Sequence, residues 1–322
     1  MVELVIDDRS GGIWDLSQLV SELSWKTSRI GRPASLEFTL LQQPHTVTNR
    51  FRCENGYIVR LRVDERDLFY GYVFSVSGGK SEDMRVLAYD QVRYLMTSDT
   101  YVLSDVTATE VVQRIATDFE LQLGRLDDTG YRIPTMVEDG QKLLDVICKA
   151  LDLTLIHSGR NFVFFDDFGE LTIRNIEELE TDFYLGADSL LYDYDYESSI
   201  DSSTYNRIKL YRDNKESGKR ELYIVQDSAT IARWGLLQLY ESVDENRNEA
   251  QIKELLDTYI TLRNRESRTI KLRAIGDTRL RAGCYVPVIL ERYDLNQPFL
   301  VEECTHSFEP GKHTMNLELK VI

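Results

Sequence analysis

Few residues in this chain have the chemistry that metal sites and disulfide frameworks need. Only four cysteines are present, Cys53, Cys148, Cys284 and Cys304, and they are widely spaced with no CxxC pair among them. That spacing fits neither a zinc motif nor a dense disulfide framework. We therefore expect reduced cysteines that serve as small core residues.

The motifs of common catalytic sites are also missing. There is no G-x-S-x-G, no H-E-x-x-H and no Walker-type glycine loop, and four histidines offer few general bases. Adjacent carboxylates do occur, as Asp166-Asp167 and Glu302-Glu303, but neighbouring residues of a strand point to opposite faces and cannot meet at one substrate. We expect neither enzymatic activity nor a cofactor.

Positive charge and long apolar runs are scarce as well. The 322 residues include 38 lysines and arginines against 54 aspartates and glutamates, a formal net charge of -16. Direct sequence-specific binding of nucleic acid needs clustered basic residues, so it is not expected. Membrane insertion is not expected either, because no apolar run approaches the ~18 residues that span a bilayer. The segment from Met1 to Asp8 lacks the basic and apolar regions of a signal peptide, so we expect synthesis in the cytoplasm.

The length of the chain predicts more than one domain, because a single core rarely grows to this size. In the first hundred residues, apolar and polar residues alternate as in half-buried antiparallel strands, for example at Leu36, Phe38 and Leu40. Helical spacing begins behind a capping-box pattern at Thr107 and returns at 143–151. Strands are therefore followed by a pair of helices.

The rest of the chain returns to strands. We expect a hairpin with strands at 162–165 and 171–173, strands at 205–211 and 221–225 joined by a polar turn at 213–219, a helix at 252–260, and strands again from Thr269. The fold class is α+β and mainly β, with two small barrel-like antiparallel β modules that flank a helical insertion. We place the first module at 1–98, the helical insertion with its hairpin at 99–179, and the second module, with an inserted helix, at 180–322.

The two ends of the chain resemble each other. The segments that begin at Gly56 and Gly283 both follow G-x-x-V-x-(L/V)-x-(V/L), and an alternating strand precedes each, at 36–40 and 270–274. Each is followed by an apolar run, a glycine turn (Gly78-Gly79 or Pro310-Gly311) and a closing strand (84–89 or 315–321). This shared order predicts an internal repeat.

The C-terminal stretch EECTHSFEPGKHTM, residues 302–315, gathers a cysteine, two histidines and several carboxylates. If Pro310-Gly311 is a two-residue turn, Cys304, His306 and His313 lie on one face of a hairpin, where they could converge on a metal. In this register Phe308 faces His313, and the same face carries the apolar residues Met315, Leu317, Leu319 and Val321, as a core face does. We expect a structural hairpin without a metal, whose histidines are either hydrogen-bonded in the core or in contact at a subunit boundary.

Three patterns follow one another along the chain in an order known from one protein family. The first is LFYGYV at 68–73, similar to an lF-x-G-x-V element in that family's first barrel. The second is AYDQVRYL at 88–95, followed by the capped helix and the stretch 124–147. The third runs from 276–283 through 301–306 to KHTMNL at 312–317, close to a C-terminal H-x-f…H-t-M pattern. Over nearly its whole length the chain resembles the tail hub, or baseplate hub, proteins of contractile-tailed phages, defective prophages and phage-like (R-type) bacteriocins of Gram-positive bacteria.

This resemblance implies a structural homotrimer at the end of the tail tube. With two similar modules in each subunit, three copies would present a roughly six-fold ring to the hexameric tube and a three-fold face to the spike. The implied partners are further copies of the chain, the tail tube protein, the central spike protein and other baseplate proteins. Such a protein is assembled into the tail of the virion or phage-like particle.

An acidic strip from Glu177 to Asp201 has two open interpretations. Residues 176–206 contain no lysine or arginine, and Tyr192, Tyr194 and Tyr196 alternate with the acidic residues Asp193, Asp195 and Glu197. A strand here would have one aromatic and one acidic face. The strip is either a solvated linker and strand edge, or it faces the lumen of a ring and repels a passing polyanion.

Two other functions compete with the structural one. A cell-wall hydrolase of the tail tip would require convergent carboxylates in an open cleft. A receptor- or glycan-binding module would use exposed aromatic side chains such as Trp14, Trp25 or Trp234, for which we favour packing in a core or interface.

Overall fold

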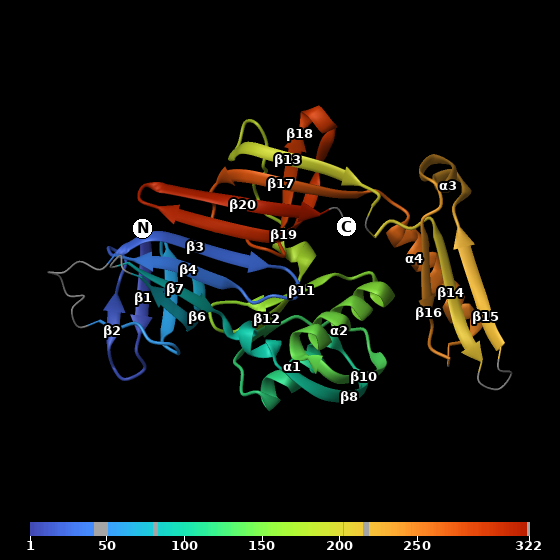
Figure 1. Ribbon diagram of the computed structural model, residues 1–322, viewed down its shortest axis with the longest axis horizontal. Coiled ribbons are helices and arrows are strands. Elements are labelled where there is room, and N and C mark those ends of the chain that lie inside the picture. Colours follow the sequence, from blue (N-terminus) through green and yellow to red (C-terminus); the bar gives the residue numbers. More distant parts are fainter. Residues whose placement is uncertain (42–50, 80–82, 202, 215–218, 246, 321–322) are drawn as a thin grey trace. The chain divides into compact units, whose positions relative to one another are not determined.

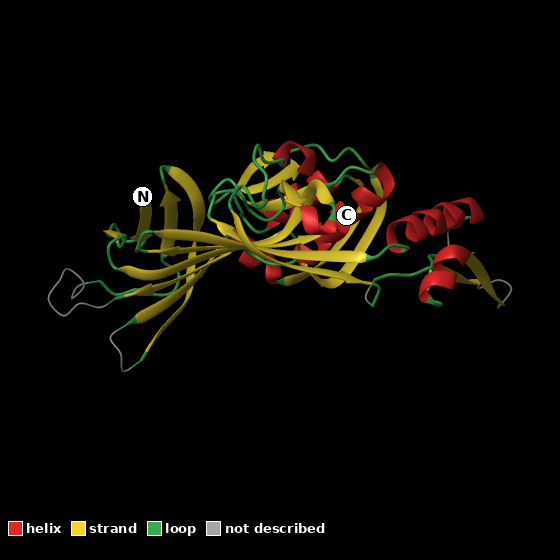
Figure 2. Ribbon diagram, turned by 90° about the horizontal axis from the view of Figure 1, so that it is seen from above, coloured by secondary structure: helices red, strands yellow, loops and turns green. Residues whose placement is uncertain are grey.

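The computed structural model describes residues 1–41, 51–79, 83–201, 203–214, 219–245 and 247–320. Residues 1–195 and 270–320 form one compact unit, and residues 196–269 form another. Strands account for more of the chain than helices do, and the helices are gathered in a few places (Figure 2). Among the described residues, no helix is both long enough and apolar enough to span a bilayer.

Twelve strands belong to one sheet, in the order β13-β17-β20-β19-β3-β4-β7-β6-β5-β1-β2, and β18 pairs with β19 (Figure 1). Their bounds are β1 (Val2–Asp7), β2 (Ile13–Asp15), β3 (Val20–Ser28), β4 (Ser35–Leu40), β5 (Ile58–Val63), β6 (Arg66–Gly78), β7 (Met84–Tyr89), β13 (Leu191–Ser199), β17 (Ser267–Ile275), β18 (Tyr285–Leu290), β19 (Leu295–Glu309) and β20 (Lys312–Lys320). Alternation along the strands decides which side chains enter the core. On β4, for example, Leu36, Phe38 and Leu40 are buried, as their spacing predicts.

The predicted repeat is visible in this strand order. The series β3-β4-β7-β6-β5 corresponds, strand for strand, to β13-β17-β20-β19-β18. The glycines ahead of the equivalent strands β5 and β18 share a left-handed backbone, with φ of 89° at Gly56 and 92° at Gly283. The two copies are joined into a continuous sheet because β19 also pairs with β3. Closure of each copy into a barrel stays a prediction.

The segment between the two copies has its own core. It contains η2 (Gln91–Met96), β8 (Ser98–Val106), α1 (Ala108–Asp118), β9 (Leu123–Leu126), β10 (Ile133–Lys142), α2 (Leu143–Ser158), β11 (Phe162–Asp166), β12 (Leu171–Asn175) and η3 (Ile176–Leu179). β11 and β12 form the expected hairpin. The helices pack together through fully buried side chains such as Val111, Ile115, Leu143 and Ile147. β8 and β10 form a two-stranded sheet that the sequence did not indicate.

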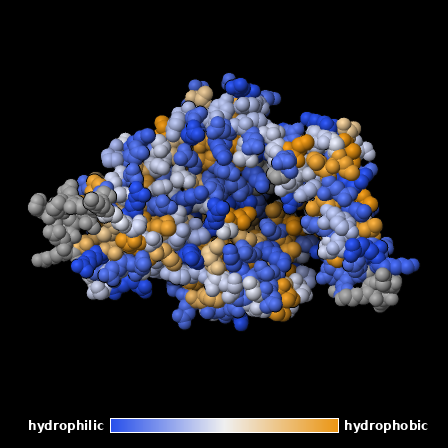
Figure 3. Space-filling view, in the orientation of Figure 1, coloured by the Kyte–Doolittle hydropathy of each residue, from blue (hydrophilic) through white to orange (hydrophobic). Residues whose placement is uncertain are grey.

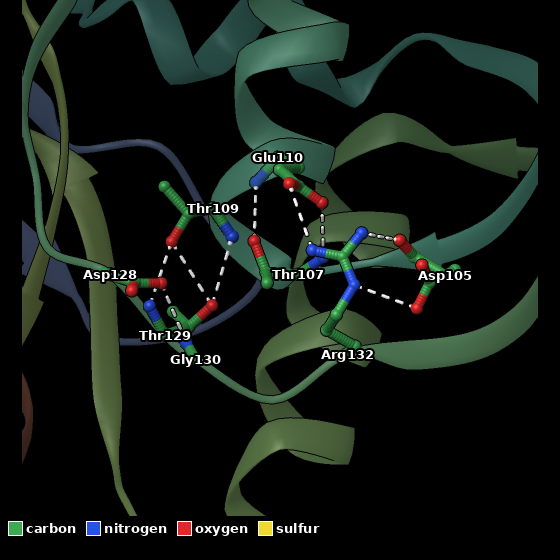
Figure 4. A network of polar contacts seen from close by, with 8 residues as sticks. All are labelled: Asp105, Thr107, Thr109, Glu110, Asp128, Thr129, Gly130 and Arg132. Atoms are coloured by element: carbon green, nitrogen blue, oxygen red, sulfur yellow. Dashed lines mark hydrogen bonds and ion pairs between the residues drawn. The ribbon is translucent and has the colours of Figure 1, made fainter.

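The capping box predicted at Thr107 begins helix α1. The Thr107 hydroxyl accepts a hydrogen bond from Glu110 N at 3.2 Å, and the Glu110 carboxylate accepts one from Thr107 N at 2.9 Å (Figure 4). Arg132, which directly precedes β10, bonds Glu110 and also reaches Asp105 of β8 at 2.8 Å, so the helix start is tied to β8 and to the beginning of β10. These contacts satisfy backbone donors that a helix N-terminus otherwise leaves unpaired.

The second unit is a small sheet covered by a helix. Its elements are β14 (Arg207–Asn214), β15 (Lys219–Gln226), α3 (Ser228–Trp234), β16 (Gln238–Ser242) and α4 (Glu249–Arg263). β14 lies between β15, to which it is antiparallel, and β16, to which it is parallel. Ile208 and Leu210 form a core with Ile252 and Leu256 of α4.

These observations confirm the expected mainly β, α+β fold. The division into 1–98, 99–179 and 180–322 remains a prediction. Residues 215–218 of the expected polar turn, and Val321 of the closing strand, lie outside the described residues.

The two equivalent glycines share a backbone conformation but differ in their surroundings, and this difference can be tested. Among described residues, a Cβ at Gly56 would meet nothing within 4 Å, whereas one at Gly283 would lie 2.6 Å from a Val163 methyl. We expect Gly56→Ala to lower the free energy of unfolding by about 1 kcal/mol through backbone strain, and Gly283→Ala by about 3 kcal/mol through strain plus overlap. Urea denaturation measures both, and equal losses would contradict this account.

Candidate functional site

The C-terminal hairpin has the register expected from its sequence. β19 and β20 pair Phe308 with His313, His306 with Met315, and Cys304 with Leu317. Cys304, His306 and Met315 are fully buried, so the expected core face is confirmed. Cys304 and His306, two of the three residues that could have converged on a metal, therefore lie in the core.

Hydrogen bonds fix the protons on both histidines. His306 Nε2 lies 2.8 Å from the carbonyl oxygen of Leu280, and a carbonyl can only accept, so Nε2 carries the hydrogen. His306 Nδ1 must then accept, and it lies 3.0 Å from His313 Nε2, which donates. The Cys304 thiol lies 3.2 Å from His306 Nε2. Both ring nitrogens of His306 are thus used within the protein.

Aromatic rings stack through this cluster from three strands. Trp25 of β3 stacks on His306 at 5.1 Å between ring centroids, and His313 of β20 stacks on Phe308 at 4.2 Å. The pair Trp25–His306 is also a register pair between β3 and β19, where the first copy of the repeat meets the second. The cluster accordingly holds the two copies together.

The protonation states also oppose metal binding. Burial lowers the pKa of His306 to about 4, and the Leu280 carbonyl only partly offsets this effect. Burial raises the pKa of the Cys304 thiol, so the thiol keeps its proton. Among the described residues no group of three or more His, Cys, Asp or Glu side chains is placed to hold a metal ion. The arrangement is suited to hydrogen bonding and stacking.

A second buried polar cluster joins three segments of the first unit. Asp90 follows β7, Asp166 ends β11 and Arg281 precedes β18. Asp90 accepts hydrogen bonds from Ala34 N and Val92 N, each at 3.1 Å. The Arg281 guanidinium donates to the Asp166 carbonyl oxygen at 3.3 Å and lies 3.8 Å from the centre of the Phe165 ring.

The charges of this cluster are coupled. Burial raises the pKa of Asp90, the negative charge of Asp166 raises it further, and Arg281 opposes both. Burial likewise raises the pKa of Asp166, although Gly169 N donates to that carboxylate at 2.7 Å. Removal of the guanidinium would leave two buried carboxyl groups without the cation that favours their ionised forms.

The space beside this cluster is small. A cavity of about 30 Å³ is lined by Thr27, Asp90, Cys148, Phe165 and Arg281, among others. That volume suits one or two water molecules and not a sugar ring. The pairs named from the sequence do not converge on a shared site: Asp166 is buried while Asp167 is exposed, and Glu302 pairs with Arg29 while Glu303 pairs with Lys26 and Arg32.

The acidic strip includes a strand at the end of the large sheet, so its interpretation as a strand edge is confirmed for β13. Tyr194 and Tyr196 are half-buried, while the intervening carboxylates are exposed, as the alternation predicts. Arg273 of β17 pairs with both Asp193 and Asp195. Whether the strip faces a lumen stays a prediction.

The tryptophans differ in their surroundings. Trp25 is a core residue, 3% exposed, and Trp14 packs against Phe51. Trp234 at the end of α3 is half-buried, with Arg233 over its ring. Packing, favoured from the sequence for all three, is confirmed for Trp25 and for Trp14, which packs against the same core.

The cluster of Asp90, Asp166 and Arg281 was not predicted from the sequence. Asp166 and Arg281 are 115 residues apart. The residues around Asp90 indicate only the end of a strand. No local spacing connects these residues. The one available signal was indirect, since Asp90 and Arg281 both lie within the patterns that carried the family resemblance.

Comparisons with known proteins agree with that resemblance. A model of a family described as YQBQ-like matches residues 23–320. The chain is 28% identical over 314 residues to the uncharacterized protein YqbQ of Bacillus subtilis (strain 168), covering 94% of this chain and 95% of the relative. It is 27% identical over 326 residues to the phage-like element PBSX protein XkdQ of the same organism, covering 99% of this chain and 97% of the relative.

A solved structure has a similar fold. The prophage MuSo2 43 kDa tail protein from Shewanella oneidensis matches with a TM-score of 0.72 and 14% identity, covering 98% of both chains. At this identity the match concerns the fold alone. Together with the family model and the PBSX relative, it confirms the resemblance to phage tail and baseplate proteins noted in the sequence.

Protonation of the His306 ring makes stability depend on pH. The folded-state pKa of about 4 lies below the value of 6.5 for an exposed histidine, so between these values the unfolded chain binds more protons. The stability contribution is full above pH 6.5 and declines as the pH falls toward 4, by about 3 kcal/mol in total. The free energy of unfolding, measured across this range, should decline less steeply in His306→Gln. Met315→Leu serves as the control, because it alters the same core contact without removing a titratable group. If His306→Gln keeps the full slope, this assignment is wrong.

Replacement of the buried guanidinium tests the second cluster. We expect Arg281→Met to lower the free energy of unfolding by about 3 kcal/mol, because it leaves buried carboxyl groups without their cation. Arg279→Met, two residues away, removes an exposed arginine that pairs with Asp277 and Asp182, and should cost much less, because exposed ion pairs contribute little to stability. Chemical denaturation of both variants gives the comparison, and a similar cost at the two positions would refute the role given to Arg281.

Proposed function

Because the chain belongs to the YQBQ-like family, whose model matches residues 23–320, we propose that it is a structural component of the tail of a phage or phage-like particle. The likeness over nearly the full length to the PBSX protein XkdQ and the shared fold with a prophage tail protein support this role. The proposed role is non-enzymatic. In support of this, the cavity that Asp90 and Arg281 line has a volume of only about 30 Å³, which is too small for a sugar ring.

Within the tail, the proposed position is that of a hub. The observation that carries this proposal is the duplicated strand order, β3-β4-β7-β6-β5 and β13-β17-β20-β19-β18. A homotrimer of such chains would display six similar modules toward a six-fold tube and keep a three-fold axis toward a spike. The tail tube protein, the central spike protein and other baseplate proteins are accordingly the proposed partners.

The direct pairing of β19 with β3 also favours this role. An adaptor between two symmetries needs its two modules held at one fixed orientation, since each must meet an equivalent site on the tube. A continuous backbone ladder from Glu303 to Phe308, with its stacked rings, supplies that rigidity better than a flexible linker would. The acidic strip would then be free to line the lumen, where it would repel a polyanion.

Deletion of the coding sequence tests the proposed function. In a bacterium that produces the particle, we expect the deletion to abolish complete tails in electron micrographs, and the wild-type chain supplied in trans to restore them. The chain should also be found by mass spectrometry in purified wild-type tails. Complete tails without the chain, or its absence from purified tails, would contradict a structural role.

A further inference from the structure

The long strands β6 and β19 are equivalent in the two copies of the repeat, and they pair in the same way. The first part of β6 pairs with β5, and the first part of β19 pairs with β18. Against their other neighbours, β7 and β20, both strands then have one extra residue, between Val73 and Ser75 in β6 and between Val301 and Glu303 in β19. Ser75 is therefore the equivalent of Glu303, and the residues that follow correspond one by one.

Beyond this extra residue, one edge of the two strands differs. In both copies the pairing with the short strand ends at the valine: Val73 O accepts a hydrogen bond from Gly56 N at 2.8 Å, and Val301 O accepts one from Gly283 N at 2.9 Å. The same edge of β19 then continues along β3, with six register pairs. In the described part of the chain β6 pairs with β5 and β7 only, so this edge of β6 has no partner strand after Val73.

The free edge of β6 can be approached by another strand. Ser75, Ser77 and Gly78 are exposed, and their side chains are small. Backbone N–H and C=O groups on an edge strand are ready to pair with a further strand, and natural sheets usually cover or block such an edge. In β19 the equivalent edge is covered by β3, so the open edge of β6 is the exception in this repeat.

The strand at one end of the sheet, β13, has the matching free edge. β13 is the equivalent of β3, which pairs with β19 on one edge and with β4 on the other. β13 pairs with β17, the equivalent of β4, and among the described residues no strand lies on its other edge. Hydrophilic residues predominate on the surface around β13 (Figure 3), so a strand added here would be held mainly by backbone hydrogen bonds.

We propose that β6 of one copy of this chain pairs with β13 of the next copy, as β19 pairs with β3 within each chain. The inference rests on the homotrimer included in the proposed function and names the strands that join its subunits. The partner is a copy of this chain because the internal junction shows which strand this edge takes: on β19 it is β3, and β13 is the equivalent of β3.

The two edges do not meet within one chain. Six strands of the sheet lie between β6 and β13, which are found on different parts of the molecule (Figure 1). A contact between two different edges repeats from copy to copy and closes into a ring when the rotation between copies allows. Because the internal junction and the subunit junction would use equivalent strands, three copies would place six modules in equivalent surroundings.

The internal junction also predicts the register of the new pair. Within the chain, Thr305 of β19 lies opposite Lys26 of β3. Two residues after Ser75, Ser77 is the equivalent of Thr305. Ser77 should therefore lie opposite the residue of β13 that corresponds to Lys26.

That residue is Glu197, as the pairing of β13 with β17 indicates. Thr39 of β4 lies opposite Glu22 of β3, and the counterpart of Thr39 in β17 is Arg273. Arg273 forms an ion pair with Asp193, which makes Asp193 the counterpart of Glu22. Glu197, four residues further along β13, therefore corresponds to the lysine and should face the β6 serine of the neighbouring copy.

A disulfide between two chains tests the pairing. When purified Ser77→Cys and Glu197→Cys chains are mixed and oxidised, we expect a linked pair of the two variants. Opposite residues of paired antiparallel strands have Cα atoms about 5 Å apart, which suits a disulfide. Non-reducing electrophoresis measures the linked fraction. Both side chains are exposed in the single chain, and circular dichroism checks that each variant is folded.

Asp193→Cys is the matched control on the same strand. It lies about 13 Å along β13 from Glu197 and should link to Ser77→Cys roughly 10-fold less, because a disulfide does not bridge that distance. Equal linking at the two β13 positions, or Ser77→Cys chains that link mainly to each other, would overturn the proposal. So would the absence of any link when the mixed chains are concentrated.

Charge at position 77 gives a second readout. Ser77→Glu would place a carboxylate opposite Glu197 of the neighbouring copy and should weaken self-association, measured by sedimentation velocity, by about 5-fold. Ser77→Lys adds a long side chain of the opposite charge and should leave association as strong or make it stronger. If both variants weaken association equally, the strands do not pair in this register and the proposal fails.

Assembled tails separate this inference from the proposed function. A chain that carries both Ser77→Cys and Glu197→Cys should form disulfide-linked multimers in purified tails. If the chain is present in tails but stays unlinked after oxidation, the strand pairing is wrong and the tail function stands. If the purified chains link through these residues but are absent from tails, the pairing stands and the tail function is wrong.

Discussion

The pairing of β19 with β3 is the constraint on which the rest of the structure depends. Six register pairs, from Glu303–Ser28 to Phe308–Leu23, turn two copies of one strand order into a single sheet. The ladder is reinforced at its centre by the stack of Trp25 on His306, and beside it Thr27 Oγ1 accepts a hydrogen bond from Ala282 N at 2.9 Å. Because a strand of each copy pairs with a strand of the other, neither copy can rotate without breaking backbone hydrogen bonds. An adaptor between a six-fold tube and a three-fold spike would need its two equivalent modules held in one fixed orientation.

The buried cluster of Asp90, Asp166 and Arg281 is a second constraint on the fold, and it has a different energetic cost. Burial of a guanidinium and two carboxyl groups is expensive, and apolar side chains of similar size would often be at least as stable. What the polar groups add is selectivity of arrangement. Asp90, Asp166 and Arg281 come from three segments, and a slip of any one leaves a buried polar group without its partner. In this account the stack of rings joins the two repeats, and the ionic cluster fixes the helical segment between them.

Local patterns in the sequence predicted local structure well. The hairpin register followed from Pro310-Gly311 and alternation, the start of α1 from a capping box, and the repeat from ordered glycines and strands. Features that depend on distant residues were not predictable in the same way. Asp166 meets Arg281 across 115 residues, β8 pairs with β10 across a helix, and α3 buries no residue and so leaves no apolar period to detect. The cluster of cysteine and histidines lies between these cases. Alternation predicted its core face, but the sequence left open whether the histidines form hydrogen bonds in the core or contacts at a subunit boundary, and the hydrogen bonds of His306 are visible only in the structure.

A reconstruction of the tail tip by cryo-electron microscopy tests the central claim most directly. We predict three copies of this chain around the tail axis. Their six similar modules should form one ring in contact with the tube. Each copy should contribute both strand series to that ring, with β19 still paired to β3. Six copies on the axis, a ring built from only one of the two modules, or a position away from the axis would contradict it.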